Sequence, residues 1–473
     1  MECFALAANK GDALRHQQDY CKAFYETPWP TKYSVDLVAD QQSEEDDLSL
    51  ELSIIKLLEE QPPIAAAEWC IYRVPKRLFD MKSTAYTPKV IAIGPFHHGR
   101  NDLLATQQSK LHCFRNYLIR IERDVKYVVA IARQWEIKAR RLYAEPINMT
   151  SDDFVRMMLI DACFIVELMI ILNFECFETR EGFDLLFAKV ILHDLYQELT
   201  MLENQLPFFV LQALFDLFPP HKNKANISFI QLTGKFLSNG LIRGYNLPCG
   251  VSSTEEVNHL VDLLGFYYVP SPDTEEYRQN KEIKNRIFLL PPTITKLCEA
   301  GVKVKKAIGA RSLLDISFKR GVLQIPPFEI HDDFEIYVRN LMAFEQYCVR
   351  EPDDDRYVIH YIEFLDGLIS TAEDVALLVK EGIIINHIGG SNKEVSELFN
   401  NLCKNTPIPF QFYFYATSKN LHDHCRKWWP RSKATLRRDY FHSPWAYISV
   451  FAATFLILLA LLQTIFTAKS TFN

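Results

Sequence analysis

Apolar residues recur at helical spacing along most of the chain, and this pattern predicts a mainly α-helical protein. Short polar runs and prolines separate the apolar stretches. Pro62 and Pro63, for example, end the first helix. The helices that we expect cover residues 47–60, 101–118, 151–172, 183–218 with a break at 204–207, 254–264, 332–347, 356–369, 371–381 and 392–403.

A shorter alternation of apolar and polar positions predicts a small β-hairpin. Leu314, Ile316 and Phe318 alternate before a turn formed by Lys319, Arg320 and Gly321, and a second strand then runs to residue 325. Short extended segments are expected around residues 70–99, where prolines interrupt the pattern. The expected fold class is therefore a large multi-helix body with one small hairpin and short extended segments.

Changes in composition divide the chain. We expect a loosely ordered N-terminal arm at residues 1–46 and a helical domain at 47–405. Within that domain, residues 219–292 are polar and turn-rich, and we expect them to be irregular and variable. A basic segment at 406–444 precedes an apolar stretch at 445–468 and a short tail at 469–473.

The apolar stretch predicts a single transmembrane helix. It contains no charged residue, and at 1.5 Å per residue a helix of this length spans about 36 Å, enough for a hydrocarbon core of about 30 Å. A buried core helix is the alternative. The membrane is thus an expected partner, through anchor residues that include Trp445, Tyr447, Phe451, Leu456, Leu459, Leu462 and Phe466.

Six basic residues between Arg426 and Arg438 precede this stretch, and Lys469 follows it. The positive-inside rule then places the body in the cytosol, at the plasma membrane or an endomembrane. The alternative is an extracellular body. It would be indicated by use of the glycosylation sequons at Asn148 and Asn226.

Composition narrows the function. Hydrophobic residues make up 48% of the chain and aromatic residues 13%, which is sufficient for a substantial core. The net charge is −7, and the basic residues concentrate near the C-terminus, so the body is acidic and we expect no nucleic-acid partner. Eleven cysteines without CxxC pairs favour a reducing compartment.

Glu203, Asn204, Gln205 and Pro207 form our candidate pocket. Pro207 interrupts a helix, and the three polar side chains can satisfy the loosened backbone groups or bind a ligand. A structural kink is the simpler interpretation.

Histidines form two weaker candidates. His97 and His98 are adjacent, so their rings should point apart and make a shared metal improbable. His422, His424 and Cys425 form a second set, in the basic segment, where we expect a solvated face.

Two acidic residues interrupt the apolar helix at 151–172. Asp161 and Glu167 are six positions apart and do not share a helix face, so they are not an acid–base pair. We expect each to meet a basic or backbone group where helices cross, because an unpaired buried carboxylate is unfavourable.

Several sequence blocks, in order, resemble the plant family called "domain of unknown function 247". The blocks are IYRVPKRLF, YTPKVIAIGPFHHG, the 107–111 region, DACFIVELM, ENQLPFFVL, LLDISFKRGVLQIPPFEI, NLMAFEQ and YFHSPWAYIS. The resemblance implies a mostly helical, C-terminally anchored plant protein with no established enzymatic activity. Some grass members are similar to proteins proposed as pollen-side determinants of self-incompatibility, which implies a recognition role.

The sequence lacks the GxSxG, P-loop, dinucleotide-binding and HExxH motifs, and we expect neither a cofactor nor a bound metal. The function that we expect is a non-enzymatic, membrane-anchored protein that presents a helical domain to a protein or peptide partner. The alternative is an unrecognised membrane-associated hydrolase or metal-dependent enzyme.

Overall fold

The computed structural model of the chain describes residues 49–56, 69–174, 189–219, 227–248, 257–283, 286–347, 356–407, 409, 411–427 and 444–471. It divides into two units, Met1–Ala67 and Glu68–Asn473. In the first unit, residues 49–56 form a helix, within the range predicted at 47–60, and their side chains are exposed. The predicted arm at 1–46 lies outside the described residues.

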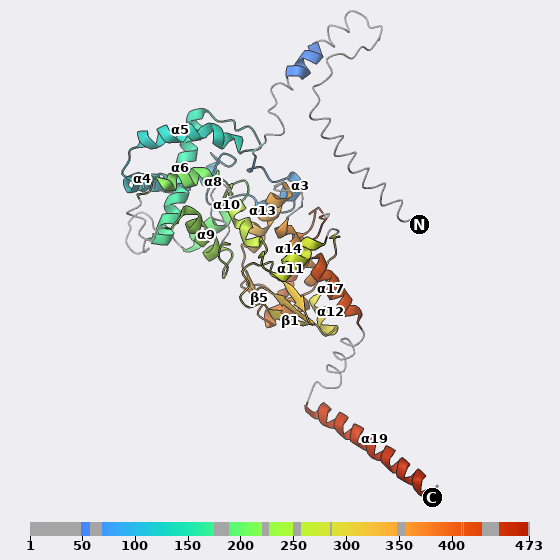
Figure 1. Cartoon of the computed structure of the whole chain (residues 1–473). Helices are drawn as coiled ribbons and strands as arrows, with labels where there is room; N and C mark the ends of the chain where they lie inside the picture. The colour runs from blue at the N-terminus through green and yellow to red at the C-terminus, as the bar shows by residue number, and fades with distance from the viewer. Residues whose placement is uncertain are drawn as a thin grey trace, which may run out of the picture. The chain divides into compact units, whose positions relative to one another are not determined.

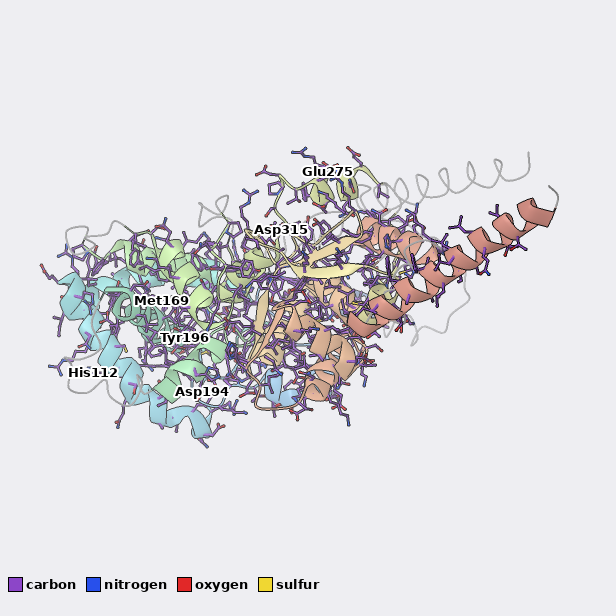
Figure 2. The ribbon with its side chains drawn as sticks, turned by 90° about the horizontal axis from the view of Figure 1, so that it is seen from below. His112, Met169, Asp194, Tyr196, Glu275 and Asp315 are labelled. Carbon is purple, nitrogen blue, oxygen red and sulfur yellow. The ribbon has the colours of Figure 1, made fainter. Side chains whose placement is uncertain are left out.

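The buried helix α6 (Ser151–Phe174) organises the first part of the second unit (Figure 1). It contacts the helices α4 (Gln107–Ile121), α5 (Val125–Arg141), α8 (Phe208–Asp216) and α9 (Phe229–Gly240), while α7 (Lys189–Glu198) packs on α9. Because neighbours surround α6, its sequence carries no polar stripe, and Met169 is fully buried. Figure 2 shows Met169 among the crowded side chains of the body.

A second group of helices packs around α13 (Phe334–Tyr347). Its contacts are with α10 (Leu260–Gly265), α14 (Tyr357–Leu368) and α16 (Asn392–Leu402), while α15 (Ala372–Lys380) packs on α16. These helices confirm the predicted ones at 332–347, 356–369, 371–381 and 392–403. A capping box at Thr371 starts α15 because its side chain and that of Asp374 satisfy free backbone groups.

Two small sheets join these helices. The predicted hairpin is confirmed as β2 (Ser317–Lys319) and β3 (Val322–Ile325), and its turn places Arg320 and Gly321 at positive φ. The strand β1 (Lys303–Lys306) extends this sheet in parallel with β3. A second, parallel pair joins β4 (Phe328–Ile330) to β5 (Ile384–Asn386).

Residues 219–292 differ from the expected irregular stretch. They contain α10, which corresponds to the helix predicted at 254–264, and in addition α9, the 3₁₀ turn η6 (Phe266–Tyr268) and α11 (Glu275–Glu282). The sequence of α9 has a capping box at Ser228 and apolar positions at helical spacing, but its glycines and polar residues made this pattern hard to recognise. The sequence analysis also did not predict several other elements separately. They are the helices α5 and α12 (Ile294–Glu299) and the short turns α3 (Lys76–Phe79), η2 (Ser83–Ala85) and η3 (Asn101–Thr106).

The basic segment at 406–444 also contains unexpected structure. Residues Tyr415–Arg426 form the helix α17, which packs against α11 and β2. Leu421 is fully buried there. This part of the segment is therefore built into the folded body, and residues 428–443 lie outside the described ones.

The apolar C-terminal stretch forms the helix α19 (Pro444–Thr471). Its described side chains are exposed, including Phe451, Leu456, Leu459 and Leu462, whereas those of Trp445, Tyr447 and Phe466 are outside the description. Among the described residues, no helix is long and apolar enough to cross a membrane. The transmembrane part of our prediction is therefore unsupported.

Candidate functional site

The candidate pocket residues are buried and make many hydrogen bonds to the backbone. Glu203 accepts from the Val74 N–H at 2.8 Å and from Arg73 at 3.2 Å. The Asn204 side chain accepts from the Ile93 N–H at 2.6 Å and donates to the Ile91 carbonyl at 3.1 Å. These polar groups thus hold the extended segment at 70–99 in place by hydrogen bonds to its backbone.

Gln205 and Pro207 complete this arrangement. The Gln205 amide donates to the carbonyls of Leu199 and Met201, both at 2.8 Å, and its oxygen accepts from the Leu260 N–H at 3.0 Å. Pro207 precedes the first residue of α8, which suits its fixed φ and missing N–H. The residues are therefore engaged in holding the fold together, and a ligand pocket at this place stays a prediction.

Glu198, which the sequence analysis did not single out, acts in the same way. Its carboxylate accepts from the N–H groups of Lys89, Val90 and Ile91 at 2.6–3.0 Å. Burial raises the pKa of Glu198, and the three N–H groups act in the opposite direction. No sequence signal distinguished this glutamate from surface ones, because its partners lie about a hundred residues earlier.

His97 and His98 point to different environments, as the sequence predicts. His98 is exposed, while the Nε2 atom of buried His97 lies 3.7 Å from the Glu203 carboxylate. That nitrogen has no hydrogen-bond partner among the described residues. Burial, and then the charges of Arg100 and Arg73, lower the pKa of His97 to about 4. The ring is therefore neutral at physiological pH.

The two carboxylates of α6 find basic partners, which confirms our expectation. Asp161 forms an ion pair with Lys110 at 2.5 Å, and both side chains are almost completely buried. Glu167 pairs with Arg120 at 2.6 Å. Both bases lie on α4, so these ion pairs lie within the interface between α4 and α6.

His422, His424 and Cys425 do not converge. The Nε2 atom of His422 bonds to the Leu290 carbonyl at 3.0 Å, whereas the His424 ring makes an edge contact with Phe318 at 5.5 Å between centroids. The Cys425 thiol has its pKa raised by burial. A shared metal at these three residues is not indicated.

An open groove lies between the hairpin turn and α17; we call it the hairpin groove. Its volume is about 890 Å³, including space open to solvent. The Nε2 atom of His424 has no described hydrogen-bond partner, and burial lowers the pKa of His424 with a contribution from Lys427. Its lining residues are Phe318, Arg320, Gly321, Asn420, Asp423, His424 and Lys427.

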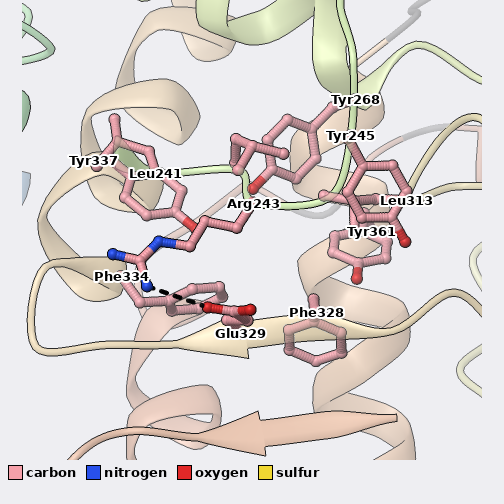
Figure 3. A pocket seen from close by; sticks show the side chains of 11 residues that line it. Leu241, Arg243, Tyr245, Tyr268, Leu313, Phe328, Glu329, Phe334, Tyr337 and Tyr361 are labelled. Atoms are coloured by element: carbon pink, nitrogen blue, oxygen red, sulfur yellow. Dashed lines mark ion pairs between the residues drawn. The ribbon is translucent and has the colours of Figure 1, made fainter. Parts of the chain in front are cut away.

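A smaller, largely aromatic pocket of about 280 Å³ lies beside β4 (Figure 3). The Tyr361 hydroxyl is buried and has no described hydrogen-bond partner. Arg243 pairs with Glu329 at 3.5 Å at the edge of this pocket (Figure 3). The volume of the pocket includes space open to solvent, and the part that a water-sized sphere can enter is about 10 Å³, far less than a drug-sized ligand needs. The pocket therefore suits water or a small group.

Glu329 also joins two histidines. His331 follows β4 and His387 follows β5, and their Nε2 atoms lie 2.9 and 3.5 Å from one carboxylate oxygen of Glu329. The sequence analysis did not find this group, because 56 positions separate the histidines and the parallel pairing of β4 with β5 was not predicted.

Comparisons with known proteins place the chain among plant proteins. The UPF0481 protein At3g47200 of Arabidopsis thaliana is 28% identical over 427 residues, covering 85% of this chain and 87% of the relative. The putative UPF0481 protein At3g02645 of the same plant is 22% identical over 497 residues, covering 85% and 90%. No solved structure matches the chain.

A family model described as "plant protein of unknown function", DUF247, matches residues 71–459. This range includes the buried hydrogen-bond hub, which is formed by Glu203, Asn204 and Gln205. It also includes the hairpin groove, the aromatic pocket and most of α19. The chain therefore belongs to the DUF247 family of plant proteins.

Proposed function

We propose that this protein is a non-enzymatic recognition protein, which binds a partner segment in the hairpin groove and associates with a membrane through α19. The observation that supports the recognition role best is the groove itself. It is open, its lining is about equally polar and apolar, and it has room for several residues of an extended chain. A buried small-molecule site would be more enclosed and more apolar.

The groove lining indicates an acidic partner. Arg320 and Lys427 are exposed at its margins, and Asp423 is the carboxylate among its lining residues. Arg320 has a positive φ in the tight turn of the hairpin. Phe318 supplies an apolar wall beside these charges. A peptide with carboxylates next to an apolar side chain would complement this surface.

The exposed surface of α19 supports membrane association. Ten large apolar side chains of this helix are exposed by 46–75%, between Ile448 and Ile465. So much apolar surface is unfavourable in water and is typical of contact with lipid or another apolar surface. With the basic residues before α19, we propose the cytosolic side of the plasma membrane or an endomembrane for the body.

Partner binding is tested with proximity labelling of the full chain in plant cells. Wild type should recover a reproducible partner that the double variant Arg320→Glu/Lys427→Glu loses. The control Lys296→Glu/Lys393→Glu makes the same charge change at two exposed lysines outside the groove. Equal recovery by the groove variant and by wild type would refute the groove as the binding surface.

Membrane association is tested by fractionation. The full chain should sediment with membranes after alkaline carbonate washing, and a chain ending at residue 443 should not. Release of the full chain by carbonate would exclude insertion in lipid. A glycosidase-sensitive shift that depends on Asn148 or Asn226 would place the body outside the cytosol.

A further inference from the structure

We infer that Glu329, His331 and His387 form a binding site for a divalent transition metal, and that Zn²⁺ is the ion that the three donors suit. The site lies at the carboxyl ends of the paired strands β4 and β5, at the edge of the aromatic pocket. It is separate from the hairpin groove, so it goes beyond the proposed function.

Strand geometry brings the three side chains together. Glu329 and His331 are two positions apart, so they share one face of the extended chain. In the parallel pairing, Ile330 lies opposite Asn386, and the His387 N–H donates to the Ile330 carbonyl at 2.9 Å. The next residues, His331 and His387, therefore lie side by side. Their rings are 4.3 Å apart between centroids and nearly parallel, at 5°.

The donor atoms are already close to the spacing that a metal requires. The two Nε2 atoms lie 2.9 and 3.5 Å from the same Glu329 oxygen, and one donor atom from each residue lies within 4.8 Å of the others. A tetrahedral Zn²⁺ at about 2.0–2.2 Å from each donor separates its ligands by roughly 3.3–3.6 Å. A small change in side-chain torsions would bring the donors to this spacing.

The parallel rings must tilt so that both nitrogen lone pairs point to one ion. The side chains have room to do so, since His331 is 20% exposed and His387 44% exposed. Two imidazoles and one carboxylate form a donor set that binds zinc in many proteins and leaves a fourth position for water. The partial exposure of this group also allows an ion to enter from solvent.

Two charged neighbours modulate the site. The Arg243 guanidinium, 3.5 Å from Glu329, competes with a cation for the carboxylate. It is 47% exposed and can turn toward solvent. The carboxyl of Asp333 is buried and interacts electrostatically with His193, His331 and Arg243.

The test uses the full chain in mild detergent, stripped with EDTA and titrated with ZnCl₂ by calorimetry and with CoCl₂ by absorption spectroscopy. We expect one Zn²⁺ per chain and a cobalt spectrum of a four-coordinate site. His331→Ala and His387→Ala should each weaken binding about tenfold or more. His98→Ala, which removes an exposed histidine elsewhere, should leave the affinity unchanged.

A further variant separates metal binding from a simple surface ion pair. Arg243→Ala removes the competing cation, so it should tighten Zn²⁺ binding several-fold and enlarge the rise in melting temperature that Zn²⁺ produces. Lack of saturable Zn²⁺ binding, or unchanged binding by the His331→Ala/His387→Ala double variant, would overturn the inference. Neither result bears on the hairpin groove, whose test uses Arg320 and Lys427.

Discussion

Lys110 and Asp161 form an ion pair in which the two charged side chains are 0% and 3% exposed, so neither charge has access to bulk water. Lys110 also donates to the Ala92 carbonyl, and the Gly94 N–H donates to Asp161 at 3.0 Å. The pair therefore joins α4, α6 and the extended segment at 70–99. These additional hydrogen bonds offset part of the cost of removing both charges from water.

Replacing one partner of this pair should strongly destabilise the fold. Lys110→Met leaves the Asp161 carboxylate buried without its counter-charge, and we expect the free energy of unfolding to fall by about 3–5 kcal/mol. Urea unfolding followed by circular dichroism measures this change. The control Lys126→Met alters an exposed lysine of α5 and should change stability little. Similar losses in the two variants would contradict the importance of the buried pair.

Replacing Asn204 by aspartate, which has nearly the same shape, should lower the stability of the fold. Its amide nitrogen donates to the carbonyls of Ile91 and Glu198 at 3.1 and 2.9 Å. Asn204→Asp replaces this donor by an acceptor facing two acceptors, and we expect a loss of about 2–4 kcal/mol. Thermal unfolding measures the effect, with Asn116→Asp on the partly exposed face of α4 as the control. A stable Asn204→Asp variant would show that the hub is dispensable for folding.

Glu363 should make stability depend on pH. Burial, and then the charge of Asp366, raise the pKa of Glu363 to about 7, and burial raises that of Asp366 to about 6. The unfolded values are about 4.3 and 3.9, so the folded state favours the protonated forms. Their stabilising contribution is complete below about pH 4 and is lost as the pH rises to about 7.

The variant Glu363→Gln isolates this effect. The neutral amide keeps an acceptor for the Cys403 thiol and carries no charge at any pH. We expect it to raise the free energy of unfolding by about 1–3 kcal/mol at pH 8 and to leave it unchanged near pH 4. Chemical unfolding at a series of pH values gives the difference. A gain that is equal at both pH values would contradict the assignment to ionisation of Glu363.

Gly240 permits the close contact between α7 and α9. A Cβ atom there would overlap the Tyr196 ring, which stacks on Phe236 at 4.4 Å between centroids. We expect Gly240→Ala to destabilise the protein by about 1–3 kcal/mol, because overpacking displaces the partly buried Tyr196 ring. Gly389→Ala is the matched control, since a Cβ at Gly389 has no neighbour within 4 Å. Calorimetric melting temperatures that fall equally in both variants would disprove the steric explanation.

Local patterns were sufficient for much of the helical fold. The apolar spacing of α6 and α13 and the capping box of α15 are properties of neighbouring residues, and the turn at Arg320 and Gly321 also depends on adjacent positions. Helices without a clear apolar stripe or with polar interruptions, such as α9 and α17, were missed. Their burial depends on the elements that pack on them.

The contacts within the candidate sites could not be predicted from local sequence patterns alone. The sequence indicated that Asp161 and Glu167 need a basic or backbone partner, but Lys110 and Arg120 became the partners only when α4 packed against α6. It also identified Glu203 and Asn204 as groups that could satisfy backbone, without indicating that residues 70–99 supply that backbone. For these residues, the sequence indicated the kind of interaction that each side chain requires, but not which residues supply it.

The sequence by itself determined the family, the mainly helical class, the hairpin and the apolar character of the C-terminal helix, because each follows from residues close together in the chain. Only the tertiary structure decided that Glu329 and His331 meet His387, and that the hairpin turn and α17 enclose a groove. The physical reason is that long-range pairing depends on how strands and helices pack. Residues more than fifty positions apart carry no local signal of the contact that they make.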